Sequence, residues 1–107
     1  MTRHGMMIGL KPEAEQEYRE LHAAVWPEVI RTIHNCNIRN YSIFAKNGLL
    51  FSYFEYHGDD FDGDMAKMAA DAATQKWWSI TMPMQTPVAS RRDGEWWAAM
   101  QEVFHLD

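Results

Sequence analysis

IRNYSIFAKNGLLFSYFEYH, residues 38–57, contains two runs of aliphatic and aromatic residues on either side of a turn signal. The runs Ile38–Ala45 and Leu49–His57 have the composition of β-strands. Between them, Lys46-Asn47-Gly48 favours a tight turn, because asparagine and glycine tolerate the backbone conformations that short hairpins require. The segment therefore predicts a β-hairpin.

The chain before the hairpin predicts a strand followed by a helix. Residues 5–10 alternate with period two, which indicates a short first strand. From about Pro12, acidic residues suit the positive end of a helix dipole, and apolar positions recur every three or four residues. Pro27 removes a backbone donor and disfavours helical geometry in the residue before it, so we expect a kink or restart near Trp26.

The chain after the hairpin predicts a loop, helices and a last strand. Gly58–Asp64 is acidic and contains glycine, which favours a loop, and residues 65–78 then show helical spacing. Two prolines end the helical region, and Glu102–Leu106 alternates like a strand. The order β-α-β-β-α-β predicts a ferredoxin-like α+β sandwich, formed by residues 1–107 as a single domain.

Composition and charge exclude several classes of partner. The 107 residues include 10 Lys and Arg against 15 Asp and Glu, so the field of the protein repels nucleic-acid phosphates and anionic lipid. No run approaches the roughly 18 apolar residues of a membrane span, and the N-terminus lacks the apolar run of a signal peptide. We therefore expect no nucleic-acid or membrane partner and a cytoplasmic location. The single cysteine, Cys36, agrees with a reducing compartment because it cannot close an internal disulfide.

The predicted sheet has helices on one face only, which leaves its other face bare. A monomer of this size rarely exposes so much apolar surface, so the sequence predicts a homodimer formed through that face. The 5 Trp, 5 Phe and 4 Tyr are also too bulky for one small interior. Some of these rings are therefore expected to face a ligand or a partner subunit.

Tyr18 and His22 are the leading candidates for chemistry. They are one helical turn apart, so their side chains lie on the same helix face and can converge. Histidine exchanges protons near neutral pH, and a tyrosine hydroxyl can orient a ligand. The same spacing also fits a hydrogen-bonded structural histidine near the helix surface, and position alone does not decide between the two.

Two tryptophan pairs have comparable alternatives. Trp77 and Trp78 suit the apolar face and the hydroxyls of a pyranose, but adjacent helical residues point about 100° apart, so one ring can instead pack inside. Trp96 and Trp97 have no acid or base beside them in the sequence. We expect this second pair in the core or at a subunit interface.

No metal or cofactor motif is visible in the sequence. The scattered histidines lack the two-histidine helical spacing with a carboxylate that is typical of zinc sites. Asp60, Asp62 and Asp64 resemble a calcium loop, but Asp71 stands where a closing glutamate is needed. We therefore expect a solvated acidic loop and no bound metal.

A series of short motifs occurs in one order along nearly the whole chain. They are Glu17-Tyr18, His22, Trp26-Pro27-Glu28, Asn40-Tyr41-Ser42-Ile43, Trp77-Trp78, Thr86-Pro87-Val88 and Glu102-Val103-Phe104-His105-Leu106. In this combination the sequence resembles the L-rhamnose mutarotase family. The resemblance implies a dimeric α+β barrel and a cofactor-free anomerase reaction on a monosaccharide, with His22 as proton donor. The sugar contacts that it implies are Tyr18, Tyr41, Trp77 and Trp78.

The residues suit this chemistry independently of the resemblance. Exchange between anomers needs a proton delivered to the ring oxygen of the sugar while the anomeric hydroxyl loses one. We expect His22 to protonate the ring oxygen, a tyrosine or a bound water to assist at the anomeric hydroxyl, and tryptophan rings to hold the apolar face of the sugar.

The stretch after Trp78 departs from the family pattern. It is shorter than expected before Pro87, and Ala89–Ala99 has the character of an insertion beside the pocket. This departure leaves L-fucose or a related 6-deoxy sugar as an alternative substrate. Two other functions stay open, namely a cofactor-free monooxygenase of the dimeric α+β barrel type and a non-catalytic sugar-binding domain.

Overall fold

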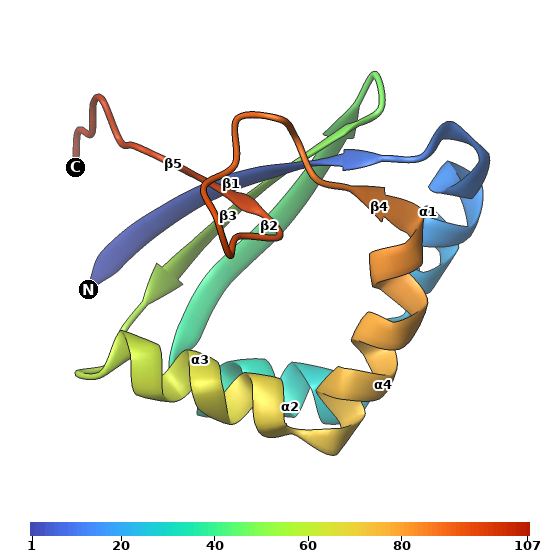
Figure 1. The fold of residues 1–107 in the computed structure, drawn as a ribbon. Coiled ribbons are helices and arrows are strands. Elements are labelled where there is room, and N and C mark those ends of the chain that lie inside the picture. The colour runs from blue at the N-terminus through green and yellow to red at the C-terminus, as the bar shows by residue number, and fades with distance from the viewer.

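The predicted hairpin forms part of a five-stranded antiparallel sheet in the computed structural model, which describes residues 1–107 (Figure 1). The sheet has the order β2-β3-β1-β4, and β5 also pairs with β1. The strands are β1 (Thr2–Leu10), β2 (Ile38–Lys46), β3 (Leu49–Tyr56), β4 (Gln85–Thr86) and β5 (Ala98–Met100). The first strand therefore joins the hairpin to the C-terminal part of the chain.

The helices lie along one side of the curled sheet (Figure 1). They are α1 (Glu15–Ala23), α2 (Pro27–Asn35), α3 (Phe61–Ala70) and α4 (Ala72–Thr81), with the short 3-10 helices η1 (Pro12–Ala14) and η2 (Met82–Met84). None of them has the length and apolar character needed to cross a bilayer. This arrangement confirms the α+β class that the sequence predicted.

Two local backbone signals act as the sequence predicted. The first long helix stops at Ala23 and restarts at Pro27, with the intervening Trp26 in an extended conformation at φ −59° and ψ 134°. The hairpin turns at Asn47 and Gly48, whose φ values are 53° and 75°. A two-residue turn with positive φ at both positions matches the right-handed twist of the strands that it joins.

The expected last strand over Glu102–Leu106 is wrong. The strand that pairs at this edge is β5, in which Met100 lies opposite Gly5 of β1. A strand needs a neighbour for its backbone hydrogen bonds, and after Met100 the chain leaves the edge of β1. The segment 101–107 is exposed, and an ion pair of 2.7 Å between Arg3 Nε and Glu102 Oε1 ties its start to the sheet.

The acidic segment Gly58–Asp64 is only partly the loop that we expected. Helix α3 already begins at Phe61, because Asp60 acts as its N-cap and accepts a hydrogen bond from the Gly63 amide at 3.0 Å. Two of the acidic residues therefore lie in the first turn of a helix, where their charge favours the positive end of the helix dipole.

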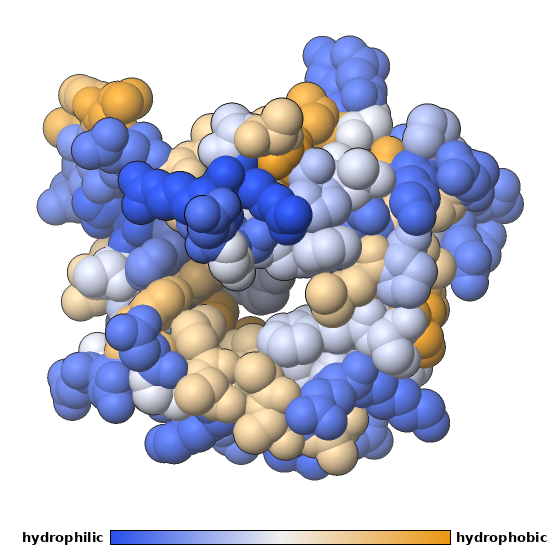
Figure 2. Space-filling view, viewed as in Figure 1, coloured by the Kyte–Doolittle hydropathy of each residue, from blue (hydrophilic) through white to orange (hydrophobic).

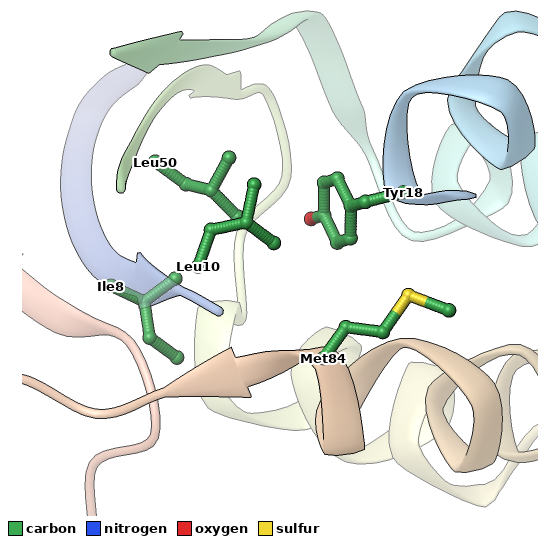
Figure 3. Packing of buried hydrophobic residues seen from close by; sticks show 5 residues of the cluster. All are labelled: Ile8, Leu10, Tyr18, Leu50 and Met84. Atoms are coloured by element: carbon green, nitrogen blue, oxygen red, sulfur yellow. The ribbon is translucent and has the colours of Figure 1, made fainter. Parts of the chain in front are cut away.

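The main core lies between the inner face of the sheet and the helices. Ile8 and Leu10 of β1 and Leu50 of β3 pack against Tyr18 of α1 and Met84 of η2 (Figure 3). All five side chains are buried. Because Tyr18 belongs to this cluster, the core itself positions the helix face that carries the candidate chemistry.

A hollow remains between the sheet and the helices, as the space-filling view shows (Figure 2). A second buried cluster, formed by Ile38, Phe54 and Tyr56, lies on the inner face of the hairpin. Phe61 and Met65 of α3 pack against it. The two clusters therefore fasten the helices to the sheet at separate places.

Candidate active site

Tyr18 and His22 converge as their spacing on α1 predicted. Their rings are stacked, with centroids 4.1 Å apart and an interplanar angle of 23°. Tyr18 is 4% exposed and His22 is half-buried. The imidazole therefore lies directly on a buried phenol ring rather than on the outer surface of the helix.

The hydrogen bond made by His22 determines which of its ring nitrogens is free. Nδ1 lies 2.8 Å from the backbone carbonyl oxygen of Tyr18. A carbonyl oxygen only accepts, so Nδ1 must be the donor, and in the neutral imidazole Nε2 then carries a lone pair. Burial lowers the pKa of His22 below its ordinary value, with the carbonyl bond acting in the opposite direction. The resting form near neutral pH is thus a neutral imidazole with Nε2 as a proton acceptor.

Trp77 and Trp26 continue the aromatic cluster around His22. The Trp77 ring meets the His22 ring edge-on, with centroids 5.3 Å apart, and the Trp26 ring meets Trp77 at 5.0 Å. Trp77 is 6% exposed, whereas Trp78 is half-buried and makes no ring contact with this cluster. The tryptophan pair is therefore divided, as the 100° rotation between adjacent helical residues requires.

Tyr41 approaches from the sheet side. A β-bulge interrupts the pairing of β2 with β3 between Arg39 and Ser42, and the Tyr41 ring meets Phe54 edge-on with centroids 5.7 Å apart. The residue is 41% exposed. Desolvation, followed by repulsion from Tyr18 when that phenol is ionised, raises the pKa of Tyr41 to about 12. Both phenols are therefore neutral hydrogen-bonding groups.

Gln85 and Trp96 also belong to the site, and Gln85 was not predicted from the sequence. Gln85 is buried on β4, and its Nε2 donates to Tyr18 Oη at 3.2 Å. Trp96 Nε1 donates to Gln85 Oε1 at 2.7 Å. Trp96 and Trp97 also pack against the main core, as expected for one of the two alternatives. The available signal for Trp96 was its place in the segment Ala89–Ala99.

The assembled groups can transfer a proton and hold a small polar ligand. They comprise one imidazole, two neutral phenols, a buried amide and indole walls, on elements that border the hollow of Figure 2. No group of three or more His, Cys, Asp or Glu side chains in residues 1–107 is placed to hold a metal ion. Imidazole and phenol side chains are among the groups that serve general acid–base catalysis in proteins.

Comparison with known sequences decides the family. A family model described as L-rhamnose mutarotase matches residues 3–106. The chain belongs to the L-rhamnose mutarotase family. An L-rhamnose mutarotase of Oceanobacillus iheyensis is 30% identical over 109 residues and covers 100% of both chains. One of Sinorhizobium fredii is 32% identical over 112 residues and covers 99% of each chain. Enzymes that bear this name are isomerases acting on carbohydrates.

Solved structures show the same fold as this member of the L-rhamnose mutarotase family. An L-rhamnose mutarotase of Formosa agariphila superimposes with a TM-score of 0.77 at 23% identity and covers 100% of both chains. The tetracenomycin F2 cyclase of Streptomyces glaucescens, a polyketide cyclase, has a TM-score of 0.73 at 15% identity over 100% of this chain and 98% of its own. The fold therefore serves more than one chemistry, and the site has to decide between them.

Proposed function

We propose that the protein interconverts the α and β anomers of L-rhamnose, with His22 as the residue that moves the proton. The observation that carries this proposal is that Nε2 of the His22 imidazole makes no hydrogen bond within the protein. The Tyr18 carbonyl holds the imidazole through Nδ1, and the Trp77 ring meets it edge-on. Full-length membership of the L-rhamnose mutarotase family supports the sugar and the reaction.

The reaction follows from this hydrogen-bond polarity. Neutral His22 accepts the proton of the anomeric hydroxyl at Nε2 and becomes an imidazolium. The anomeric C–O bond gains double-bond character as the bond from that carbon to the ring oxygen breaks. The imidazolium then gives its proton to the ring oxygen, which leaves an open-chain aldehyde and a neutral imidazole. Rotation about the first C–C bond and closure by the reverse steps produce the other anomer.

The remaining predicted residues serve as sugar contacts in this proposal. Tyr18 and Tyr41 present neutral hydroxyls, and Trp77 presents an indole ring beside His22. Trp78, which is half-buried and lies outside the ring cluster, is the fourth sugar contact of the proposal. Broad aromatic walls with few hydrogen bonds leave the open chain free to rotate, which anomer exchange requires.

Exchange spectroscopy tests the proposal directly. At equilibrium the two anomers of L-rhamnose give separate proton NMR signals, and addition of the protein should transfer magnetisation between them. The same measurement with L-fucose establishes which 6-deoxy sugar is preferred. The proposal is wrong if the protein leaves the exchange rate of both sugars at the level of a buffer blank.

The pH dependence of the exchange rate should reflect the neutral form of His22. The rate should be level around pH 7 and fall as the pH is lowered through the pKa of His22, which burial places below its ordinary value of 6.5. The sign follows because protonation removes the lone pair at Nε2 that accepts the anomeric proton. Saturation transfer across a pH series, corrected for exchange in buffer alone, measures this fall in the exchange rate at low pH. A rate that instead rises towards acid would show that the cationic form begins the reaction.

The proposal includes a homodimer formed through the outer face of the sheet. Phe44, Leu49, Phe51 and Met100 share this face and remain 60%, 44%, 40% and 47% exposed in the single chain. Phe44 and Phe51 lie opposite each other on β2 and β3, with ring centroids 6.3 Å apart. A second copy covering this patch would remove a large apolar area from water.

Light scattering tests the homodimer with a charge placed on this face. The native protein should have twice the mass of one chain, and Phe44→Glu should shift it to the monomer, because a carboxylate buried between two sheets loses its hydration. Ile30→Glu is the matched control, since Ile30 is 52% exposed on α2, on the helical side of the molecule. A native protein of monomeric mass would contradict this part of the proposal.

A further inference from the structure

Gln85 connects Tyr18 of α1 with Trp96 of the segment Ala89–Ala99. Its side chain is 6% exposed and lies between Tyr18 and Trp96. Its backbone is fixed as well, because Gln85 pairs with Leu10 of β1 in the sheet. The side-chain amide is therefore held by one hydrogen bond at its nitrogen and one at its oxygen.

The direction of these two hydrogen bonds is determined by the chemistry of the indole. Trp96 Nε1 carries a hydrogen and cannot accept, so the atom of Gln85 at 2.7 Å from it must be the carbonyl oxygen. The amide NH₂ of Gln85 then faces Tyr18 Oη, 3.2 Å away, and must donate to it. Without Trp96 the amide could turn over and offer its oxygen to the phenol instead.

This direction leaves the hydrogen of the Tyr18 hydroxyl uncommitted within the protein. The phenol oxygen accepts from Gln85, and the NH₂ that faces it offers no lone pair. Tyr18 stays protonated, because burial raises its pKa above the ordinary value, while the bond from Gln85 lowers it less strongly. The hydroxyl hydrogen is thus available to a ligand, and the phenol ring that carries this hydroxyl is stacked on the His22 imidazole.

We propose that Gln85 and Trp96 are positioning residues which hold the Tyr18 hydroxyl as a hydrogen-bond donor to the sugar oxygen on which negative charge develops. The inference rests on the proposed anomer exchange. It assigns the role of proton acceptor to His22 and the role of hydrogen-bond donor to Tyr18. His22 accepts a proton, and Tyr18 stabilises the oxygen that has lost it. It also gives the segment Ala89–Ala99, through Trp96, a role in the specificity of the site.

Replacing Trp96 by phenylalanine removes the indole N–H and keeps an aromatic ring. We expect kcat for anomer exchange to fall about tenfold, the equivalent of one modest hydrogen bond, with KM little changed. We expect kcat rather than KM to change, because the negative charge on the sugar oxygen exists in the transition state and not in the bound sugar. Trp97→Phe is the matched control, since Trp97 packs on the same core without a hydrogen bond to Gln85, and it should leave kcat unchanged.

A double-mutant cycle separates positioning from general loosening of the site. In a Tyr18→Phe background there is no hydroxyl to orient, so adding Trp96→Phe should cause no further loss of kcat. If the losses of kcat in the two single variants multiplied in the double variant, Trp96 would act through packing alone, and the inference would be overturned. Gln85→Met, which keeps the shape of the side chain but removes its amide, should lower kcat by at least as much as Trp96→Phe, and an unaffected kcat would likewise overturn it.

A measurement without sugar distinguishes failure of this inference from failure of the proposed function. The ¹³Cζ signal of Tyr18 reports the ionisation of its hydroxyl, and its pKa should be higher in Trp96→Phe than in the native protein because a turned amide no longer donates to the phenolate. An upward shift in a protein without exchange activity would support the hydrogen-bond direction and reject only the anomerase reaction. An unchanged Tyr18 pKa in an active protein would reject the inference alone.

Discussion

Substituting His22 by asparagine is expected to slow catalysed anomer exchange by about 10²–10⁴-fold, the usual contribution of a positioned acid–base group. Asparagine places an amide N–H near the position of Nδ1, so it can keep the bond that His22 donates to the Tyr18 carbonyl. It has no atom at the position of Nε2 and no proton to exchange near neutral pH. The loss should therefore appear in kcat, while sugar affinity stays close to that of the native protein.

The matched control for this substitution is His34→Asn. His34 is exposed near the end of α2 and makes no ring contact with the site, so its replacement should leave the exchange rate unaltered. Exchange spectroscopy gives the rates, and titration of sugar signals gives the affinities. If His22→Asn exchanged the anomers as fast as the native protein, proton transfer would have to be assigned to another group, and the tyrosines would be the next candidates.

Removing the side chain of Leu50 is expected to have the largest effect on stability. Leu50 is 1% exposed and packs with Ile8, Leu10 and Tyr18 in the main core (Figure 3). Leu50→Ala should lower the free energy of unfolding by about 2–5 kcal/mol, because it loses buried apolar area and leaves a cavity. Since Tyr18 borders that cavity, the exchange rate should also decrease at temperatures where the variant is folded.

Urea unfolding followed by circular dichroism measures the stability change. Ile30→Ala is the comparison, because it removes an aliphatic side chain from a position on α2 that is 52% exposed. Its free energy of unfolding should stay within about 0.5 kcal/mol of the native value. A Leu50→Ala variant as stable as Ile30→Ala would show that the core can close over the missing side chain, and that Tyr18 does not depend on it.

Several features of the fold and site were predictable because short-range chemistry determines them. The Asn47-Gly48 turn, the helix restart at Pro27 and the shared helix face of Tyr18 and His22 each depend on residues within one or two turns of backbone. The order of motifs along the chain, which involves no contact between distant residues, likewise indicates the family that the family model confirms.

The sequence by itself therefore determined the local elements, the family and the residue types that can transfer a proton. Only the tertiary structure decided that β5, not residues 102–106, completes the sheet, that Trp77 rather than Trp78 meets His22, and that Gln85 donates to Tyr18. The physical reason is distance along the chain. Gln85 lies 67 residues from Tyr18, and the direction of its hydrogen bonds is defined only when packing brings a third group, the Trp96 indole, against its oxygen.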